Sequence, residues 1–227
     1  MKTLKESIFR IKTLMKLSEV VDHSAFNISS LKELKSFKQR LDYCAGHLQR
    51  LGSGSSRIVF KIDDGTVLKL AKNRKGVSQN NTESDYTIQS HYGGVIAKIK
   101  NYCDDDLWIV CELARKVKKE DFKNLAGVSY EIFDEYMNMR IMEDIRKSRT
   151  YEIGHSLTPE QIEFCNNNEF ICEILDLMAN YSLAGGDLTR LSSYGVVNRD
   201  GDNTLVLVDY GATDAILQNM YMREELD

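Results

Sequence analysis

Three short apolar runs between residues 47 and 71 constrain the fold most, because each alternates apolar and polar positions with the two-residue period of a β-strand. The runs are HLQRL, RIVFKI and TVLKLA. A glycine- and serine-rich segment, residues 52–56, separates the first two, and the hairpin signal Asp63-Asp64-Gly65 separates the second from the third. The sequence therefore predicts an antiparallel meander of three strands.

Two later runs extend this pattern. VIAKIK and LWIVCEL are joined through residues 104–106, which are three aspartates, and they predict a second hairpin. The polar segment before them predicts a short helix over residues 79–89. Five strands and one helix would form a first lobe over residues 46–113.

Helical spacing precedes the strands. Apolar residues recur at helical intervals between residues 4 and 15, and Ser30 precedes a second such run that continues to Leu41. Two amphipathic helices are therefore expected within residues 1–45, as an extension before the first lobe.

Helical spacing also follows the strands. Residues 119–147 carry apolar positions three and four apart, which predicts a helix. Thr158, Pro159 and Gln161 form an N-cap, a first-position proline and a capping-box partner, so a further helix should begin at Pro159. Its apolar positions predict that it continues to about residue 183, where Gly185-Gly186 would end it.

A last hairpin is expected near the end of the chain. YGVV and TLVLVDYG flank a polar turn over residues 198–203. The predicted fold is α+β: a five-stranded antiparallel lobe and a reduced helical lobe over residues 114–227, preceded by the two helices.

Charge and composition exclude several classes of protein. The net charge is −4, and residues 1–50 hold ten Lys and Arg against five Asp and Glu, so the remainder carries −9. An acidic body without clustered basic and aromatic residues does not predict nucleic-acid binding. The basic N-terminal segment, whose cations are mixed with acids, is interpreted as a solvated helix face.

Cellular context follows from the apolar pattern and the cysteines. No run approaches the length of a membrane span or a signal peptide, so no membrane is expected and the protein is predicted to be cytoplasmic. Five cysteines without a C-x-x-C pair indicate free thiols. Four isolated histidines do not predict a zinc site.

The glycine-rich segment is the first candidate for chemistry. Gly52, Ser53, Gly54 and Ser55 have small side chains, which allow backbone N–H groups to approach phosphate oxygens. An ordinary hairpin turn is the alternative. The segment is not a Walker P-loop, because the Gly-Lys-Ser/Thr ending and the following helix are missing.

Lys69 is the second candidate. It lies in the apolar run next to the one that leaves the glycine-rich segment, where an ammonium would meet phosphates. Strand alternation also allows a position on a solvent face. Glu83 is placed to pair with Lys69, or else it faces water like most helix acids.

Two aspartates complete the set. Asp209 ends an apolar strand and precedes Tyr210-Gly211, a position typical of a metal ligand or a general base. Asp187 follows the double glycine, where a helix-terminating turn is the alternative explanation.

In this order, the pieces resemble the protein-kinase-like superfamily over roughly residues 46–211. The segment from Gly52 to Val59 resembles its glycine-rich loop, with Arg57 where the third glycine would stand. Val67-Leu68-Lys69 looks like the strand lysine motif, and Asp209-Tyr210-Gly211 looks like the Asp-Phe-Gly motif.

The resemblance implies roles for these residues. ATP and magnesium would be the ligands, with Lys69 on the phosphates, Glu83 holding Lys69, and Asp209 on the metal. Asp187 would be the base that accepts a hydroxyl proton. Glu112 and Leu113 look like the hinge whose backbone meets adenine.

The departures from the family are equally specific. Gly185-Gly186 replaces the His-Arg that precedes the catalytic aspartate, and Ser192 stands where an asparagine would bind a second magnesium. Only 16 residues follow Gly211, so the segment that docks peptide substrates in the family is missing. The chain looks like a truncated, atypical member, similar in shape to kinase-like proteins carried by bacteriophages.

Two functions remain open at this level. One is a small ATP-dependent phosphotransferase with an unknown hydroxyl acceptor. The other is a pseudokinase that binds a protein partner, such as a host factor in the host cytoplasm if the chain is phage-encoded. Residues 1–45 would supply the interaction surface in the second case.

Overall fold

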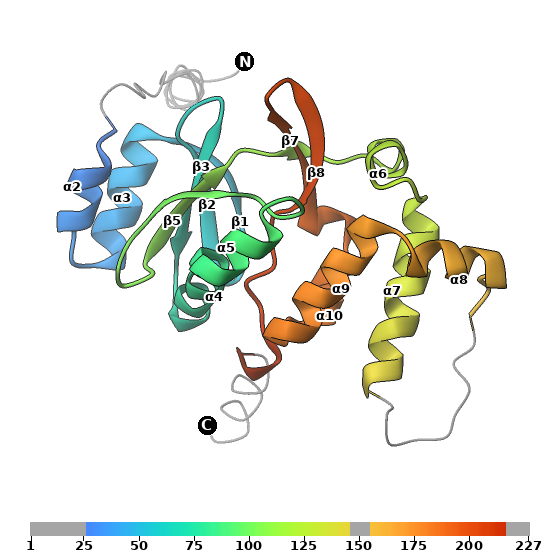
Figure 1. The fold of residues 1–227 in the computed structure, drawn as a ribbon. Helices are drawn as coiled ribbons and strands as arrows, with labels where there is room; N and C mark the ends of the chain where they lie inside the picture. Colours follow the sequence, from blue (N-terminus) through green and yellow to red (C-terminus); the bar gives the residue numbers. More distant parts are fainter. Residues whose placement is uncertain (1–25, 146–154, 217–227) are drawn as a thin grey trace, which may run out of the picture.

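The computed structural model describes residues 26–145 and 155–216, which form two lobes (Figure 1). One lobe is built on a five-stranded sheet and the other is mainly helical. The predicted α+β architecture with an antiparallel five-stranded sheet is confirmed. The predicted helix over residues 4–15 lies outside the described residues.

The sheet has the order β1-β2-β3-β5-β4, with every neighbouring pair antiparallel. Its strands are β1 (Gln49–Ser53), β2 (Arg57–Lys61), β3 (Thr66–Ala71), β4 (Ile99–Tyr102) and β5 (Trp108–Glu112). The strand expected from residue 95 starts later, because Ile96 makes a parallel bridge to Leu207 of the other lobe. The polar-apolar alternation thus predicted where the strands lie, but not that Ile96 would pair with Leu207.

The strand register separates two faces of the sheet. Val59 pairs with Lys69 and Val67 pairs with Cys111, so these four side chains lie on one face. The other face carries a core of large apolar side chains that includes Phe60, Leu68, Leu70 and Trp108.

Two helices, α2 (Ile28–Glu33) and α3 (Phe37–His47), pack on that apolar core through Leu31 and Cys44. A single helix was predicted from Ser30 to Leu41, and this prediction is wrong. The chain breaks because Ser36 caps α3 in a capping box with Gln39. Burial of the Cys44 thiol against this core raises its pKa to about 12, with a smaller opposing effect from Arg40.

The helix expected over residues 79–89 is also two helices, α4 (Arg74–Ser84) and α5 (Tyr86–Tyr92). Asp85 separates them, because its side chain accepts a hydrogen bond from the backbone of Ile88 and so begins α5. Asn73 caps the start of α4 in the same way, by accepting from Gly76.

The helical lobe begins with α6 (Lys119–Ala126) and α7 (Tyr130–Ile145), where one helix over residues 119–147 was predicted. Gly127 ends α6 in the left-handed conformation with φ 73°, a conformation that glycine adopts at little cost.

The capping box at Thr158 is present and begins α8 (Pro159–Asn166), as predicted. The expected continuation to residue 183 is wrong, because Asn168 caps a separate helix, α9 (Glu169–Tyr181). Ser182 ends α9 with φ 49°.

The prediction that Gly185-Gly186 ends the long helix is therefore wrong, because α9 already ends at Tyr181. Gly185 begins the short helix α10 (Gly185–Leu188), and the reason for the glycine is close packing. A Cβ at position 185 would lie 2.7 Å from the side chain of Ile141 on α7.

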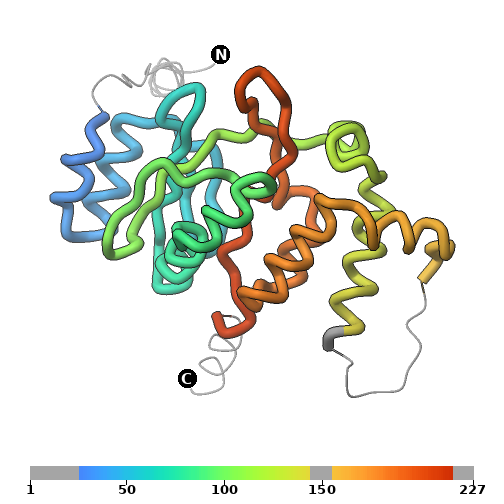
Figure 2. Tube along the Cα trace, viewed as in Figure 1, coloured from blue at the N-terminus to red at the C-terminus, as the bar shows by residue number. Residues whose placement is uncertain are grey.

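The predicted last hairpin is confirmed as β7 (Tyr194–Arg199) and β8 (Asp202–Leu207). The short strand β6 (Arg115–Lys116), which the sequence did not predict, joins β7, and the short 3-10 helix η2 (Leu191–Ser193) precedes it. After β8 the chain runs back between the lobes, beside α4 on one side and the end of α9 on the other (Figure 2). This return places residue 209 between the two lobes.

Candidate functional site

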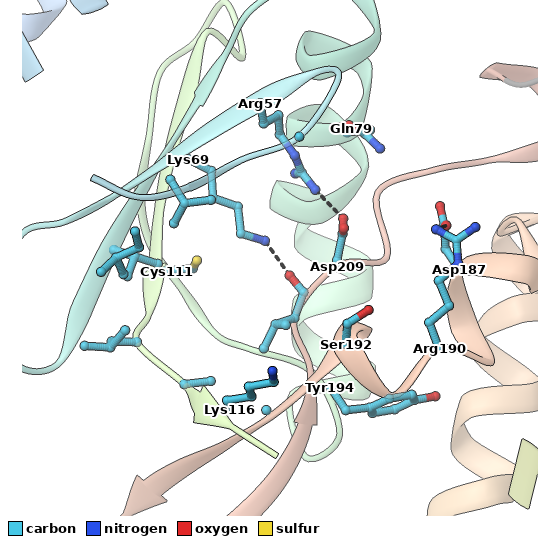
Figure 3. Close-up of a pocket in the computed structure, with 18 of the residues that line it drawn as sticks. Arg57, Lys69, Gln79, Cys111, Lys116, Asp187, Arg190, Ser192, Tyr194 and Asp209 are labelled. Carbon is cyan, nitrogen blue, oxygen red and sulfur yellow. Dashed lines mark hydrogen bonds and ion pairs between the residues drawn. The ribbon is translucent and has the colours of Figure 1, made fainter. Parts of the chain in front are cut away.

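A cleft of about 670 Å³ lies between the sheet lobe and the helical lobe. The glycine-rich segment, β3 and the end of β5 form one side of it, and α10, η2 and the chain after β8 form the other (Figure 3). Nine of the residues that the sequence singled out line the cleft: Gly54, Ser55, Val59, Lys69, Glu112, Leu113, Asp187, Ser192 and Asp209.

Lys69 is buried on the cleft face of β3 and does not face solvent. Its Nζ lies 2.6 Å from Oε2 of Glu83, and the Glu83 side chain is only 1% exposed. Nζ also donates to the carbonyl of Val208 at 2.5 Å, directly before Asp209. The expected Lys69–Glu83 pair is thus present, and it ties β3 to α4 and to the other lobe.

Arg57 is the principal residue of this site whose role the sequence reasoning missed. Its Nη2 lies 2.7 Å from Oε1 of Glu83. The same nitrogen lies 2.6 Å from Oδ1 of Asp209 (Figure 3). Its side chain is 8% exposed, whereas that of Asp209 is 56% exposed. We refer to Arg57, Lys69, Glu83 and Asp209 as the charge quartet.

Contacts within the charge quartet favour the ionised forms of Glu83 and Arg57. Burial alone would raise the pKa of Glu83, but Arg57 and Lys69 outweigh that effect and hold the pKa below its ordinary value. Burial opposes the charge of Arg57 as well, yet Glu83 and Asp209 raise its pKa further. Two cations and two carboxylates therefore share one partly buried site with no net charge.

Tyr210-Gly211 fixes the segment that carries Asp209. The Tyr210 hydroxyl donates to the backbone carbonyl of Glu83 at 3.0 Å, and the backbone N–H of Gly211 donates to Glu83 Oε1 at 3.2 Å. A Cβ at position 211 would lie 2.4 Å from the carbonyl oxygen of Gln79 on α4. Only a glycine permits this approach without a shift of α4 or of the segment.

Hydrogen bonds from the residues just before α4 and from α4 itself hold the glycine-rich segment in place. Lys72 donates to the carbonyl of Gly54 at 2.8 Å, and Asn73 donates to that of Ser55 at 3.2 Å. The hydroxyl of Ser56 donates to Gln79 at 2.5 Å. The segment is therefore a supported turn, with its carbonyls directed to α4.

The same turn leaves donors at its tip. The N–H of Gly54 donates to the carbonyl of Arg57, but within the described parts of the chain the N–H groups of Ser55 and Ser56 meet no acceptor. Free backbone N–H groups on a turn are a common means of binding anions. Gly52 and Ser53 belong to exposed β1 and do not line the cleft.

The expected hinge lies along the rear of the cleft. The carboxylate of Glu112 is turned to Arg199, 2.7 Å away on β7, and the N–H of Leu113 donates to the carbonyl of Gly65. Burial raises the pKa of the adjacent Cys111 thiol, which also lines the cleft. Glu112 and Leu113 line the cleft, but these two groups are directed to the protein.

Asp187 lies across the cleft from Lys69 (Figure 3). Its Oδ1 pairs with Nη1 of Arg190 at 3.1 Å, and the two side chains are 29% and 66% exposed. Ser192 lines the cleft between them and β7. Asp187, Asp209 and Ser192 thus share a single cleft although three separate segments carry them.

The magnesium role of Asp209 and Ser192 stays a prediction, and the donor set does not fit a metal that the chain holds by itself. One oxygen of Asp209 is already bonded to Arg57, and a serine hydroxyl is a weak ligand for a hard cation. Among the described residues, no group of three His, Cys, Asp or Glu side chains is placed to hold a metal ion. The guanidinium of Arg57 thus contacts Asp209, the residue for which a metal was expected.

One signal in the sequence could have located Arg57. It alternates with Ile58 and Phe60 of the core and shares the face of Val59, so the strand period already directs it to the cleft. Nothing in the sequence indicates that it would bridge Glu83 and Asp209, 26 and 152 positions away.

Comparisons with known proteins are limited. No family model and no curated protein matches the sequence. Among solved structures, the chain is similar to SAICAR synthase from Saccharomyces cerevisiae complexed with SAICAR, with 9% identity, 72% of this chain and 73% of that chain covered, and a TM-score of 0.36.

A second similarity is to the GDP and kanamycin complex of APH(2")-IIia, with 11% identity, coverage of 74% and 68%, and a TM-score of 0.35. A third is to the streptomycin–ATP ternary complex of APH(2")-IIa, with 14% identity, coverage of 72% and 65%, and a TM-score of 0.29. We therefore infer function from the residues of the cleft and not from these likenesses.

No helix in the described parts of the chain is both long and apolar enough to cross a membrane.

Proposed function

We propose that the cleft binds the phosphates of a nucleoside triphosphate, ATP by the resemblance of its motifs. The buried Lys69–Glu83 pair carries this proposal. A lysine inside an apolar strand is stabilised at the cleft by a carboxylate from a separate helix, an arrangement that packing alone does not require. The free N–H groups of Ser55 and Ser56 lie on the same cleft wall.

In this proposal, Gly54 and Ser55 cover the phosphates while Lys69 donates to them. Val59 on the cleft face of β2, and the segment Glu112-Leu113, would border the base and the ribose. Gly52 and Ser53 contribute through the shape of the loop. Glu83 acts by holding Lys69 and Arg57 in place.

Phosphoryl transfer is the first candidate activity. Asp187 is an accessible carboxylate on the wall opposite Lys69, where an acceptor hydroxyl would enter. The acceptor oxygen would form a bond to the γ-phosphorus as the bond to the β-phosphate oxygen breaks, and Asp187 would take the hydroxyl proton. Arg190 would hold the Asp187 carboxylate in position.

Nucleotide binding without transfer is the second candidate, and a specific observation favours it. Both aspartates expected to serve chemistry are already paired with arginines, Asp187 with Arg190 and Asp209 with Arg57. A pseudokinase of this kind would act by binding a protein partner. Bacteriophage origin, a host factor as partner and a cytoplasmic location remain predictions.

Isothermal titration with ATP, GTP and ADP tests the binding proposal. Lys69→Met should weaken ATP binding by about tenfold or more, since it removes one charge-assisted contact. Lys100→Met is the matched control, because Lys100 is an exposed lysine of β4 in the same sheet but outside the cleft. If neither ATP nor GTP binds the wild-type protein, the proposal is wrong.

Incubation with γ-labelled ATP separates the two candidates. Label on a small molecule or protein of a cell extract that disappears with Asp187→Asn would support transfer. Binding of ATP without any labelled product, and with Asp187→Asn unaltered in affinity, would support the pseudokinase.

A further inference from the structure

We propose that Arg57 takes the place of a metal ion, so that the cleft binds the nucleoside triphosphate in its metal-free form. This inference rests on the proposed nucleotide binding and adds to it the ionic form of the ligand. Its basis is the arginine bridge between Glu83 and Asp209.

A carboxylate next to a polyphosphate repels it unless a cation stands between the two, and a bound divalent metal usually has this part. Here the Arg57 guanidinium already touches Asp209 Oδ1 at 2.6 Å. The repulsion that a metal would relieve is therefore relieved by a side chain.

Arg57 is buried, and it is anchored by Glu83 at 2.7 Å and more weakly by Asn80 at 3.4 Å, both on α4. A magnesium ion that bound Asp209 Oδ1 in the place of Arg57 would have to displace this guanidinium, which leaves only the second carboxylate oxygen, Oδ2, for a metal. Displacement would leave Arg57 inside the protein with one carboxylate fewer, which is costly for a buried charge.

Besides the neutral charge quartet, the lining includes Lys75 on α4 and Lys116 on β6. Neither lysine has a carboxylate partner among the residues that the structure describes. The acidic residues Glu112 and Asp187 are both paired with arginines.

The cleft therefore has a positive excess in a protein whose net charge is −4. A polyanion without its metal carries more negative charge than the metal complex, so this lining favours the metal-free ligand. Arg57 retains unused N–H donors, because a guanidinium has five and the contacts above use three.

The test is isothermal titration of ATP into the full-length protein, once with EDTA and once with excess magnesium. We expect the affinity in EDTA to be equal to or greater than that in magnesium. Binding only in magnesium would overturn the inference and leave the proposed function intact. Absence of binding in both conditions would overturn both.

Arg57→Met gives the decisive variant. It exposes Asp209 to the phosphates, so binding in EDTA should fall by about tenfold or more, and magnesium should restore part of it. Arg57→Lys keeps a cation and should retain binding in EDTA. Unchanged binding in EDTA for Arg57→Met would contradict the inference.

Asp209→Asn provides a test that does not remove the buried arginine. If Arg57 replaces the metal, the variant should bind ATP in magnesium at least as tightly as the wild type does, because Asp209 holds no ion there and the variant loses only a carboxylate charge. If Asp209 holds magnesium, the variant should instead bind more weakly in magnesium. The sign of the change thus decides between the two roles even if Arg57→Met does not fold.

Discussion

The two walls of the cleft are built differently. On the sheet wall, Lys69, Arg57 and Glu83 are buried, and each contacts at least two other groups. On the helical wall, Asp187 and Arg190 form one exposed pair on the four-residue helix α10 and the residues after it. The charged side chains of the sheet wall are thus held by several buried contacts, whereas the Asp187 side chain of the helical wall has, among the described residues, one solvent-screened ion pair.

Burial therefore fixes the charged side chains of the two walls to different degrees. Moving Glu83 or Arg57 would leave charges unpaired inside the protein, so their positions are fixed by a large free-energy penalty. Moving Asp187 breaks an exposed ion pair, which contributes little to stability. Substitutions of Glu83 or Arg57 should therefore lower the free energy of unfolding more than substitutions of Asp187 do.

The largest effect is expected at Glu83. Glu83→Ala removes the only carboxylate, among the described residues, that contacts both Lys69 and Arg57, and a broken buried pair costs about 3–5 kcal/mol of unfolding free energy. Urea unfolding monitored by tryptophan fluorescence measures it, since Trp108 lies in the sheet core. A loss below about 1 kcal/mol would contradict the view of Glu83 as the centre of the wall.

The next effect is expected at a pair of glycines. Gly211→Ala places a methyl group 2.4 Å from the Gln79 carbonyl and should cost about 1–3 kcal/mol. Gly186→Ala on α10 is the matched control from the helical wall, because nothing lies within 4 Å of the position that its Cβ would take. Equal melting temperatures for the two variants would remove the distinction between the walls.

Acid pH should weaken the sheet wall through Glu83. Its pKa is lower in the folded protein than its ordinary value of 4.5, so the unfolded chain takes up the proton first. Stability is then fully present above pH 4.5 and is lost as pH falls through the folded pKa. The free energy of unfolding of Glu83→Gln should depend less on pH in that range than that of the wild type, as urea unfolding of both proteins across the range would measure.

The smallest effect on stability is expected at Asp187. Asp187→Ala removes one exposed pair and should change the free energy of unfolding by about 0.5 kcal/mol or less. Any loss of phosphoryl transfer in this variant would then be a loss of chemistry. A loss of unfolding free energy as large as that of Glu83→Ala would show that packing also fixes Asp187 on the helical wall.

The sequence predicted the elements better than their ends. Period-two alternation located the five strands and the last hairpin, because the apolar faces of Ile58, Phe60 and Leu68 are local features. Helix breaks were missed at Ser36, Asp85 and Asn168 because a polar cap within a helical pattern also fits an exposed helical position.

The candidate site was predictable residue by residue but not as a network. Motif order indicated Lys69, Glu83 and Asp209, yet the pairing of Asp209 depends on a guanidinium 152 positions earlier. Such long-range pairing follows from how α4 and the chain after β8 pack, as Gly211 against Gln79 illustrates. Local sequence patterns carry no information about that contact.

The most direct measurement is a crystal structure of the protein with a non-hydrolysable ATP analogue, grown with EDTA. We expect phosphate oxygens within hydrogen-bond distance of Lys69 Nζ and of the Ser55 and Ser56 N–H groups, with Arg57 still bonded to Asp209. Phosphates bound elsewhere, or a cleft that stays empty at saturating analogue both with EDTA and in a second crystal grown with excess magnesium, would contradict nucleotide binding by the charge quartet and the glycine-rich segment.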